Sequence, residues 1–185
     1  ERVRTQLRAA AFALAHERPV DGITVGDLVA RAGVSRQVFY RHYRDRDDAV
    51  TAAISAAFAD AVAEVGDVDA RTRILGLFDF AAEHRSMYRN IVPSTVTLHV
   101  IRTFRDALVP ACEDIAAQGM SVVAAVAPLP AESVSRFLVG GFMEVLRSWM
   151  EDPAATELAG RVHAALDTVD ALLGISTASK GPHDG

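Results

Sequence analysis

The sequence contains a single cysteine, Cys112, so no disulfide can form within the chain. It has no unbroken apolar run of about 18 residues, the length that a membrane-spanning helix needs, and no visible signal peptide. A reducing cytoplasm is therefore the simplest compartment, and no membrane partner is expected. The sequence does not begin with methionine, which suggests that it starts inside the native chain.

Signatures of catalysis and of metal binding are also missing. The six histidines are scattered singly, and His84 directly follows Glu83 instead of standing in the Glu-x-x-His spacing of carboxylate-bridged metal sites. A cysteine without a placed partner is not a zinc site, and no glycine-rich phosphate loop or nucleophile motif is present. We therefore predict no catalytic residue, no metal site and no cofactor.

Charge is distributed unevenly along the chain. The net charge of −5 argues by itself against DNA binding. Residues 1–50, however, hold nine Lys+Arg against seven Asp+Glu, whereas residues 51–185 hold ten against seventeen. A basic head on an acidic body suits a DNA-binding protein with a separate regulatory part.

Residues 24–50 predict two short helices joined by a tight turn. Thr24 is placed to cap the first helix, and Gly33 stands where that helix ends, because glycine enters the left-handed conformation without a Cβ penalty. Ser35 is placed to cap the second helix, residues 36–42, whose outward side is polar and basic. A capped helix, a glycine-bearing turn and a basic second helix are typical of a DNA-reading helix-turn-helix.

The same residues resemble the tetracycline-repressor-type (TetR) family of regulators over about residues 7–50. The matching positions are Thr24, Ala32-Gly33-Val34-Ser35, Phe39-Tyr40, His42-Tyr43 and Arg46-Asp47. Phe39, Tyr43 and Arg46 stand where the family commonly has leucine, phenylalanine and lysine, and these exchanges keep the chemistry. The resemblance implies a ligand-responsive transcriptional repressor that binds a pseudo-palindromic operator as a homodimer.

Candidate DNA contacts lie mainly on the second helix of the motif. Arginine and glutamine at its start can reach base edges in the major groove, and a valine can touch a thymine methyl. By resemblance, Tyr40 gives its hydroxyl to a phosphate, although a partly buried core aromatic is the alternative. The full set is Thr24, Ser35, Arg36, Gln37, Val38, Tyr40, Arg41, His42 and Arg46.

Apolar periodicity along the chain predicts an all-α fold of about nine helices without a strand. Besides the motif, the expected helices cover residues 3–17, 45–65, 70–84, 86–91, 95–118, 131–151 and 154–173. Leu98 and Ile101 are expected on the buried side of the helix 95–118, and Pro110 should kink it. Residues 119–130 are expected to form a loop-like connection. The domains we predict are a helix-turn-helix domain 1–48, an effector-binding and dimerisation domain 49–174, and a flexible tail 175–185.

The last two predicted helices carry wide apolar stripes, which exceed what a monomer of this length needs for its own core. By resemblance, they pair with a second copy as a four-helix bundle, and Gly140-Gly141 would permit close approach. An internal core is the alternative. The predicted interface residues are Val134, Phe137, Leu138, Gly141, Val145, Leu158, Val162, Leu166, Val169 and Leu173.

An effector pocket is implied by the resemblance alone. Its candidate lining is Phe78, Met87, Tyr88, Leu98, His99, Arg102, Phe104, Leu108, Cys112, Phe142 and Trp149, each of which also suits plain core. An apolar majority favours a lipophilic or aromatic effector. Two other functions stay open: a helical small-molecule-binding protein without specific DNA readout, and an all-α enzyme that uses the apolar cavity.

Overall fold

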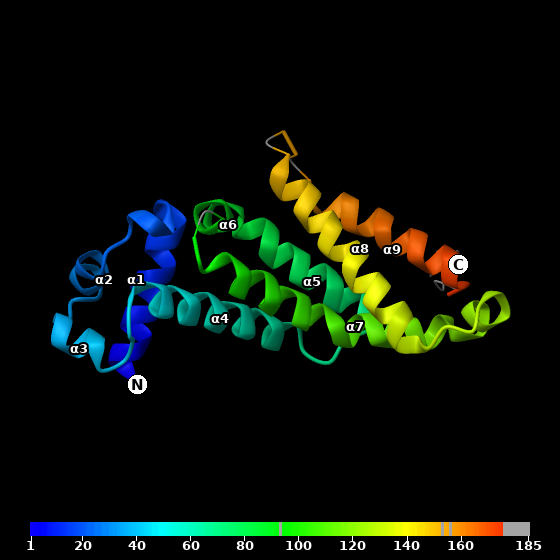
Figure 1. Ribbon diagram of the computed structural model, residues 1–185, viewed down its shortest axis with the longest axis horizontal. Helices are drawn as coiled ribbons and strands as arrows, with labels where there is room; N and C mark the ends of the chain where they lie inside the picture. The colour runs from blue at the N-terminus through cyan, green and yellow to red at the C-terminus, as the bar shows by residue number, and fades with distance from the viewer. Residues whose placement is uncertain (93, 153, 156, 176–185) are drawn as a thin grey trace, which may run out of the picture. The chain divides into compact units, whose positions relative to one another are not determined.

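The computed structural model describes residues 1–92, 94–152, 154–155 and 157–175. These residues form nine α-helices and one 3-10 helix, and no strand occurs among them (Figure 1). The predicted all-α fold is therefore confirmed. The elements are α1 (Arg2–Glu17), η1 (Val20–Gly22), α2 (Val25–Ala32), α3 (Arg36–Tyr40), α4 (Arg46–Val65), α5 (Ala70–Glu83), α6 (Arg85–Ile91), α7 (Thr97–Val126), α8 (Ala131–Glu151) and α9 (Ala159–Leu173).

The described residues pack into two units. Unit 1 contains Glu1–Val68 and Gly76–Ala107, and unit 2 contains Asp69–Leu75 and the chain from Leu108 onward. Helices α5 and α7 are each divided between the two units, with one part in unit 1 and the other in unit 2. Because α4 packs on α1, the packing of unit 1 continues past residue 48. The domain boundaries given above rest on function and stay a prediction.

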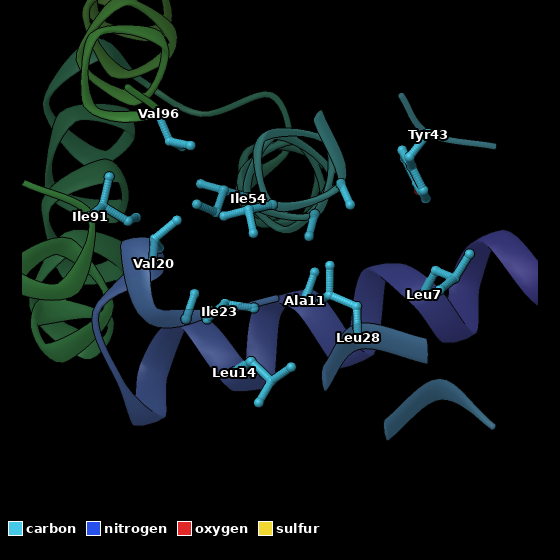
Figure 2. Packing of buried hydrophobic residues seen from close by; sticks show 14 of the residues in the cluster. Leu7, Ala11, Leu14, Val20, Ile23, Leu28, Tyr43, Ile54, Ile91 and Val96 are labelled. Atoms are coloured by element: carbon cyan, nitrogen blue, oxygen red, sulfur yellow. The ribbon is translucent and has the colours of Figure 1, made fainter. Parts of the chain in front are cut away.

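The core of unit 1 holds the N-terminal helices against α4 and α6. Apolar residues recur along one side of α1 at helical spacing and meet side chains from η1, α2 and α4. Each large apolar side chain buried in this way contributes about 1.5–3 kcal/mol. Figure 2 shows part of the cluster, which includes Leu7, Ala11, Leu14, Val20, Ile23, Leu28, Tyr43, Ile54, Ile91 and Val96.

A second group of apolar side chains in unit 1 is aromatic. Phe104 lies edge-on to Phe78, with ring centroids 5.3 Å apart. Phe58 lies edge-on to Phe80 at the same distance and contacts Phe104 at 5.7 Å. All four rings are buried, and such pairs add about 0.5–1.5 kcal/mol beyond the area that they bury.

Unit 2 is built around α8, α9 and the second part of α7. Helices α8 and α9 lie side by side (Figure 1). A Cβ added at Gly119 of α7 would lie 2.7 Å from the Cβ of Leu173, so α7 and α9 approach closely at this glycine. Arg71 of α5 binds α9 through Asp167 at 2.6 Å and Asp170 at 2.9 Å.

The predicted loop over residues 119–130 is wrong for its first part. Helix α7 continues through Gly119 and ends at Val126, because the missing side chain at Gly119 lets the helix pass Leu173. Only residues 127–130 connect α7 to α8. The register of α7 also differs from the prediction. Leu98 and Ile101 are exposed, whereas Val96, Val100 and Phe104 are buried.

The last helix begins five residues later than predicted. Asp152 accepts a hydrogen bond from the backbone N–H of Ala154 through its side chain, at 3.0 Å, and one from Ala155 through its carbonyl, at 3.2 Å. These bonds close a turn, and α9 then starts at Ala159. Most of the predicted tail, residues 176–185, lies outside the described residues.

No single helix in the described parts of the chain is long and apolar enough to cross a membrane. Only the bent pair α7 and α8, taken together, reaches that length and composition.

Candidate nucleic-acid interface

Local hydrogen bonds define both ends of α2. The hydroxyl of Thr24 accepts the backbone N–H of Asp27 at 3.1 Å, and the Asp27 carboxylate accepts the backbone N–H of Thr24 at 2.8 Å. This reciprocal capping box satisfies donors that the helix itself cannot bond. At the other end, Gly33 has a φ of 66° and Val34 donates its N–H to the carbonyl of Val29 at 3.0 Å. The predicted cap and the predicted glycine stop are confirmed.

The Asp27 carboxylate is kept ionised by its neighbours. Hydrogen bonds from the side chain and the backbone of Thr24, followed by the bond from Arg18, lower the pKa of Asp27 to about 2. The Arg18 guanidinium lies 3.0 Å from this carboxylate. The negative charge in the first turn of α2 is therefore compensated within the chain.

Helix α3 follows α2 directly and is short. The hydroxyl of Ser35 caps it by accepting the N–H of Val38 at 3.3 Å. The helix ends at Tyr40, earlier than predicted, and Arg41 and His42 stand in the turn that follows. Arg36, Gln37, Arg41 and His42 are exposed, as predicted for a surface that reads DNA, whereas Val38 is partly buried.

The three aromatic residues of the motif, Phe39, Tyr40 and Tyr43, divide between core and surface. Phe39 is completely buried and Tyr43 is buried, whereas the side chain of Tyr40 is 58% exposed. The rings of Phe39 and Tyr40 meet edge-on with centroids 5.3 Å apart. Tyr40 is thus held by the core at one edge, and its hydroxyl is accessible to a partner. This placement favours the outward role of Tyr40 over the core alternative.

Arg46 differs from the other candidate contacts because its guanidinium is already engaged. It donates to the carbonyls of Asp21 at 3.0 Å and Ile23 at 3.3 Å, and it pairs with Asp47 at 2.6 Å. Its side chain is only 24% exposed. Arg46 therefore ties the start of α4 to the segment that precedes α2, and its contact with DNA stays a prediction.

The arginines of residues 1–50, all of which the structure describes, fall into two groups. Arg18, Arg31, Arg44 and Arg46 each have an acidic partner. Among the described residues, none forms an acidic partner for Arg2, Arg4, Arg8, Arg36 or Arg41, so their charges are available to an external anion. In a helix-turn-helix, such arginines contact the phosphates of DNA.

The predicted effector residues are divided between the two units. Phe78, Met87 and Phe104 are buried in unit 1 and Tyr88 is partly buried there, while Leu98, His99 and Arg102 are exposed. Burial raises the pKa of the Tyr88 hydroxyl above its usual range. Leu108, Cys112, Phe142 and Trp149 are buried and belong to unit 2. Burial, with a smaller effect from Glu113, raises the pKa of Cys112 to about 12.

The predicted dimer residues also divide into two groups. Phe137 is 77% exposed, Gly141 is exposed, and Val145 and Val169 are partly buried. The other six are buried within the chain itself and belong to its own core: Val134, Leu138, Leu158, Val162, Leu166 and Leu173. The first group lies on the parts of α8 and α9 that the described chain does not fully cover, and its role in a dimer stays a prediction.

One contact of unit 1 was not predicted. Nε2 of His16, on α1, lies 3.0 Å from Nδ1 of His84, which follows α5. Phe12 and Phe80 pack edge-on against the His84 ring. The two histidines are 68 positions apart, and a lone histidine gives no sequence signal of a distant partner.

Fold and site together define a helix-turn-helix DNA-binding protein of the all-α class. Residues 7–53 match the family model described as "Bacterial regulatory proteins, tetR family". Residues 7–53 are thus similar to the N-terminal region of TetR-family transcriptional regulators. No curated protein matches the chain in sequence.

Solved structures share the fold over most of the chain. The fatty acid degradation regulator FadR from Bacillus halodurans aligns with a TM-score of 0.64 and 14% identity, covering 93% of this chain and 98% of its own. FadR from Bacillus subtilis, in complex with stearoyl-CoA, gives 0.67 and 12%, covering 89% and 96%. A tetR-family transcriptional regulator from Streptomyces coelicolor gives 0.65 and 21%, covering 95% and 85%.

Proposed function

We propose that this protein is a cytoplasmic transcriptional repressor, not an enzyme, that binds a pseudo-palindromic operator as a homodimer and is released by a small lipophilic or aromatic effector. One observation carries the proposal: the capped helix-turn-helix exposes Tyr40, and five arginines of residues 1–50 have no acidic partner within the described parts of the chain. Gln37 and Arg36 would read bases, while Tyr40 and the remaining cations would hold the phosphates.

The dimer would form through the open face of α8 and α9. Phe137 on α8 is 77% exposed and Leu172 on α9 is 69% exposed. A Cβ added at Gly140 or Gly141 would meet no atom within 4 Å, so a partner helix has room to approach the backbone there. Two heads related by a two-fold axis would meet half-sites about 34–36 Å apart.

The effector would bind between α4 and the helices that follow it. The buried aromatic group of Phe58, Phe78, Phe80 and Phe104 supports an apolar ligand, because separating such side chains exposes surface that an apolar molecule can cover. The B. subtilis FadR structure, which shares this fold, contains stearoyl-CoA, and we extend the lipophilic class to the present chain. Helix α4 joins the head to the remaining helices, and effector binding would shift it. The shift would favour a state with low operator affinity over the DNA-binding state.

In vitro selection from a random double-stranded pool would supply the operator, and fluorescence anisotropy would then compare it with scrambled DNA. We expect specific binding that weakens steeply as salt increases. Arg36→Ala combined with Tyr40→Phe should abolish the specificity. Specific binding that survives both changes would refute the assigned roles. Equal affinity for selected and scrambled DNA would instead favour a small-molecule-binding protein without DNA readout.

Light scattering at micromolar concentration tests the dimer. A mass of 19.8 kDa, that of one chain, would refute it.

A further inference from the structure

Gly26, the second residue of α2, occupies a position where glycine has no backbone reason to stand. Among the described glycines, Gly33, Gly66 and Gly174 have positive φ, and Gly26 does not. Within a helix, glycine is less stable than alanine because it loses more conformational freedom on folding. The missing side chain at Gly26 is therefore explained by the space that it leaves.

That space is next to Arg36. A Cβ added at Gly26 would lie 3.2 Å from Nη2 of Arg36 and 3.3 Å from Oγ1 of Thr24. The guanidinium of Arg36, the first residue of α3, thus rests against the bare first turn of α2. Thr24 cannot move aside, because its hydroxyl is fixed by the capping box with Asp27.

The position of Arg36 is electrostatically unfavourable. A positive charge at the first position of a helix opposes the helix dipole, and no acidic side chain of the described residues pairs with Arg36. Arginine also has many rotamers, so restricting its guanidinium before DNA arrives reduces the entropy that binding must remove. The bare turn at Gly26 provides one wall of such a restriction.

We propose that Gly26 is a positioning residue for sequence readout: by lacking a side chain, it leaves the space in which the Arg36 guanidinium lies, and so sets the base preference that Arg36 imposes. The proposal rests on the proposed function of the head as a specific DNA reader. A side chain at position 26 keeps every charge of the head and displaces the guanidinium from the first turn of α2.

The test measures the relative affinity for single-base variants of the selected operator. Arg36→Ala should lose about tenfold discrimination at one position of each half-site. Gly26→Gln should lose a similar factor at the same position, and Gly26→Ala, whose methyl requires a smaller shift, a few-fold. Adding Gly26→Gln to Arg36→Ala should cause no further loss, because both changes act through one side chain.

Gly22→Ala is the matched control, since a Cβ there meets nothing within 4 Å, and it should leave all preferences unchanged. Thermal unfolding of each Gly26 variant is measured beside the wild type, which separates a change in readout from a loss of folding. Wild-type preference in Gly26→Gln, an additive loss in the double variant, or a merely uniform weakening by Arg36→Ala would each overturn the proposal. If the wild type itself selects no sequence, the proposed function fails instead.

Discussion

The arginines of the head and those of unit 2 are treated in opposite ways. In residues 1–50, five of nine arginines have no acidic partner among the residues whose structure is described. In the described part of unit 2, all five arginines have one: Arg71, Arg73, Arg136, Arg147 and Arg161. Composition contributes to this difference, because acidic residues are fewer than arginines in residues 1–50 and exceed the basic residues in residues 51–185.

The two regions also expose different kinds of side chain. The head exposes uncompensated positive charge, which attracts anions and is sensitive to salt. In the described part of unit 2, the arginines are paired with acidic side chains. The same part exposes large apolar side chains on α8 and α9, which favour association with an apolar surface. The comparison therefore predicts that substitutions in the two regions will affect different properties.

The largest effect is expected at Phe137. Phe137→Asp puts a charge at the centre of the proposed apolar interface, and we expect the dimer dissociation constant to rise on the order of hundredfold. Sedimentation or light scattering across a dilution series measures it. Leu98→Asp, at a side chain that is 74% exposed in unit 1, is the control and should leave the dimer intact. A dimer that tolerates Phe137→Asp would place the interface elsewhere.

The next effect compares unpaired with paired arginines at equal charge. Arg36→Ala with Arg41→Ala should lower operator affinity roughly tenfold for each residue and reduce the salt dependence by about two ions. Arg31→Ala with Arg44→Ala removes the same charge from the head, but both arginines already have acidic partners. Anisotropy titrations at several salt concentrations should show a much smaller change for this pair. Equal losses would mean that only the total charge matters.

The smallest effect concerns the His16–His84 contact. Burial, and then the nearby charge of His16, lowers the pKa of His84, while Glu83 opposes this shift. The folded state therefore binds a proton less readily than the unfolded chain, whose histidine pKa is about 6.5. Stability should be complete above that pH and should decrease as the pH falls through it.

Urea denaturation at pH 7.5 and pH 5.5 measures this loss. His84→Gln should lose less stability on acidification than the wild type. His163→Gln, at an exposed histidine of α9, is the control and should behave as the wild type. If His84→Gln keeps the full pH dependence, the contact has no role in it.

Features that depend on neighbouring residues were predicted correctly from sequence. The caps at Thr24 and Ser35 and the glycine stop at Gly33 all appear in the structure. Each capping bond joins residues three positions apart, so the capping side chain and the backbone N–H that it bonds can both be identified within one short stretch of sequence. The exposed side of α3 was predicted correctly for the same reason, because its polar residues and the buried Phe39 belong to one short segment.

Features that depend on distant residues were not predictable in this way. Helix α7 passes Gly119 only because Leu173, on another helix, packs against the bare position. Six predicted interface residues are core because the chain covers them itself. Periodicity shows that a helix face is apolar, but it does not show which surface buries it.

The helix-turn-helix, its caps and the excess of arginine at the N-terminal end were determined by the sequence alone, since each follows from short-range geometry and residue type. Only the tertiary structure decided which arginines are free. Arg46 meets Asp21 across 25 positions, and Arg71 meets Asp167 across 96, and folding alone brings such groups within reach. The available charge of the head is thus what remains after packing has paired the rest.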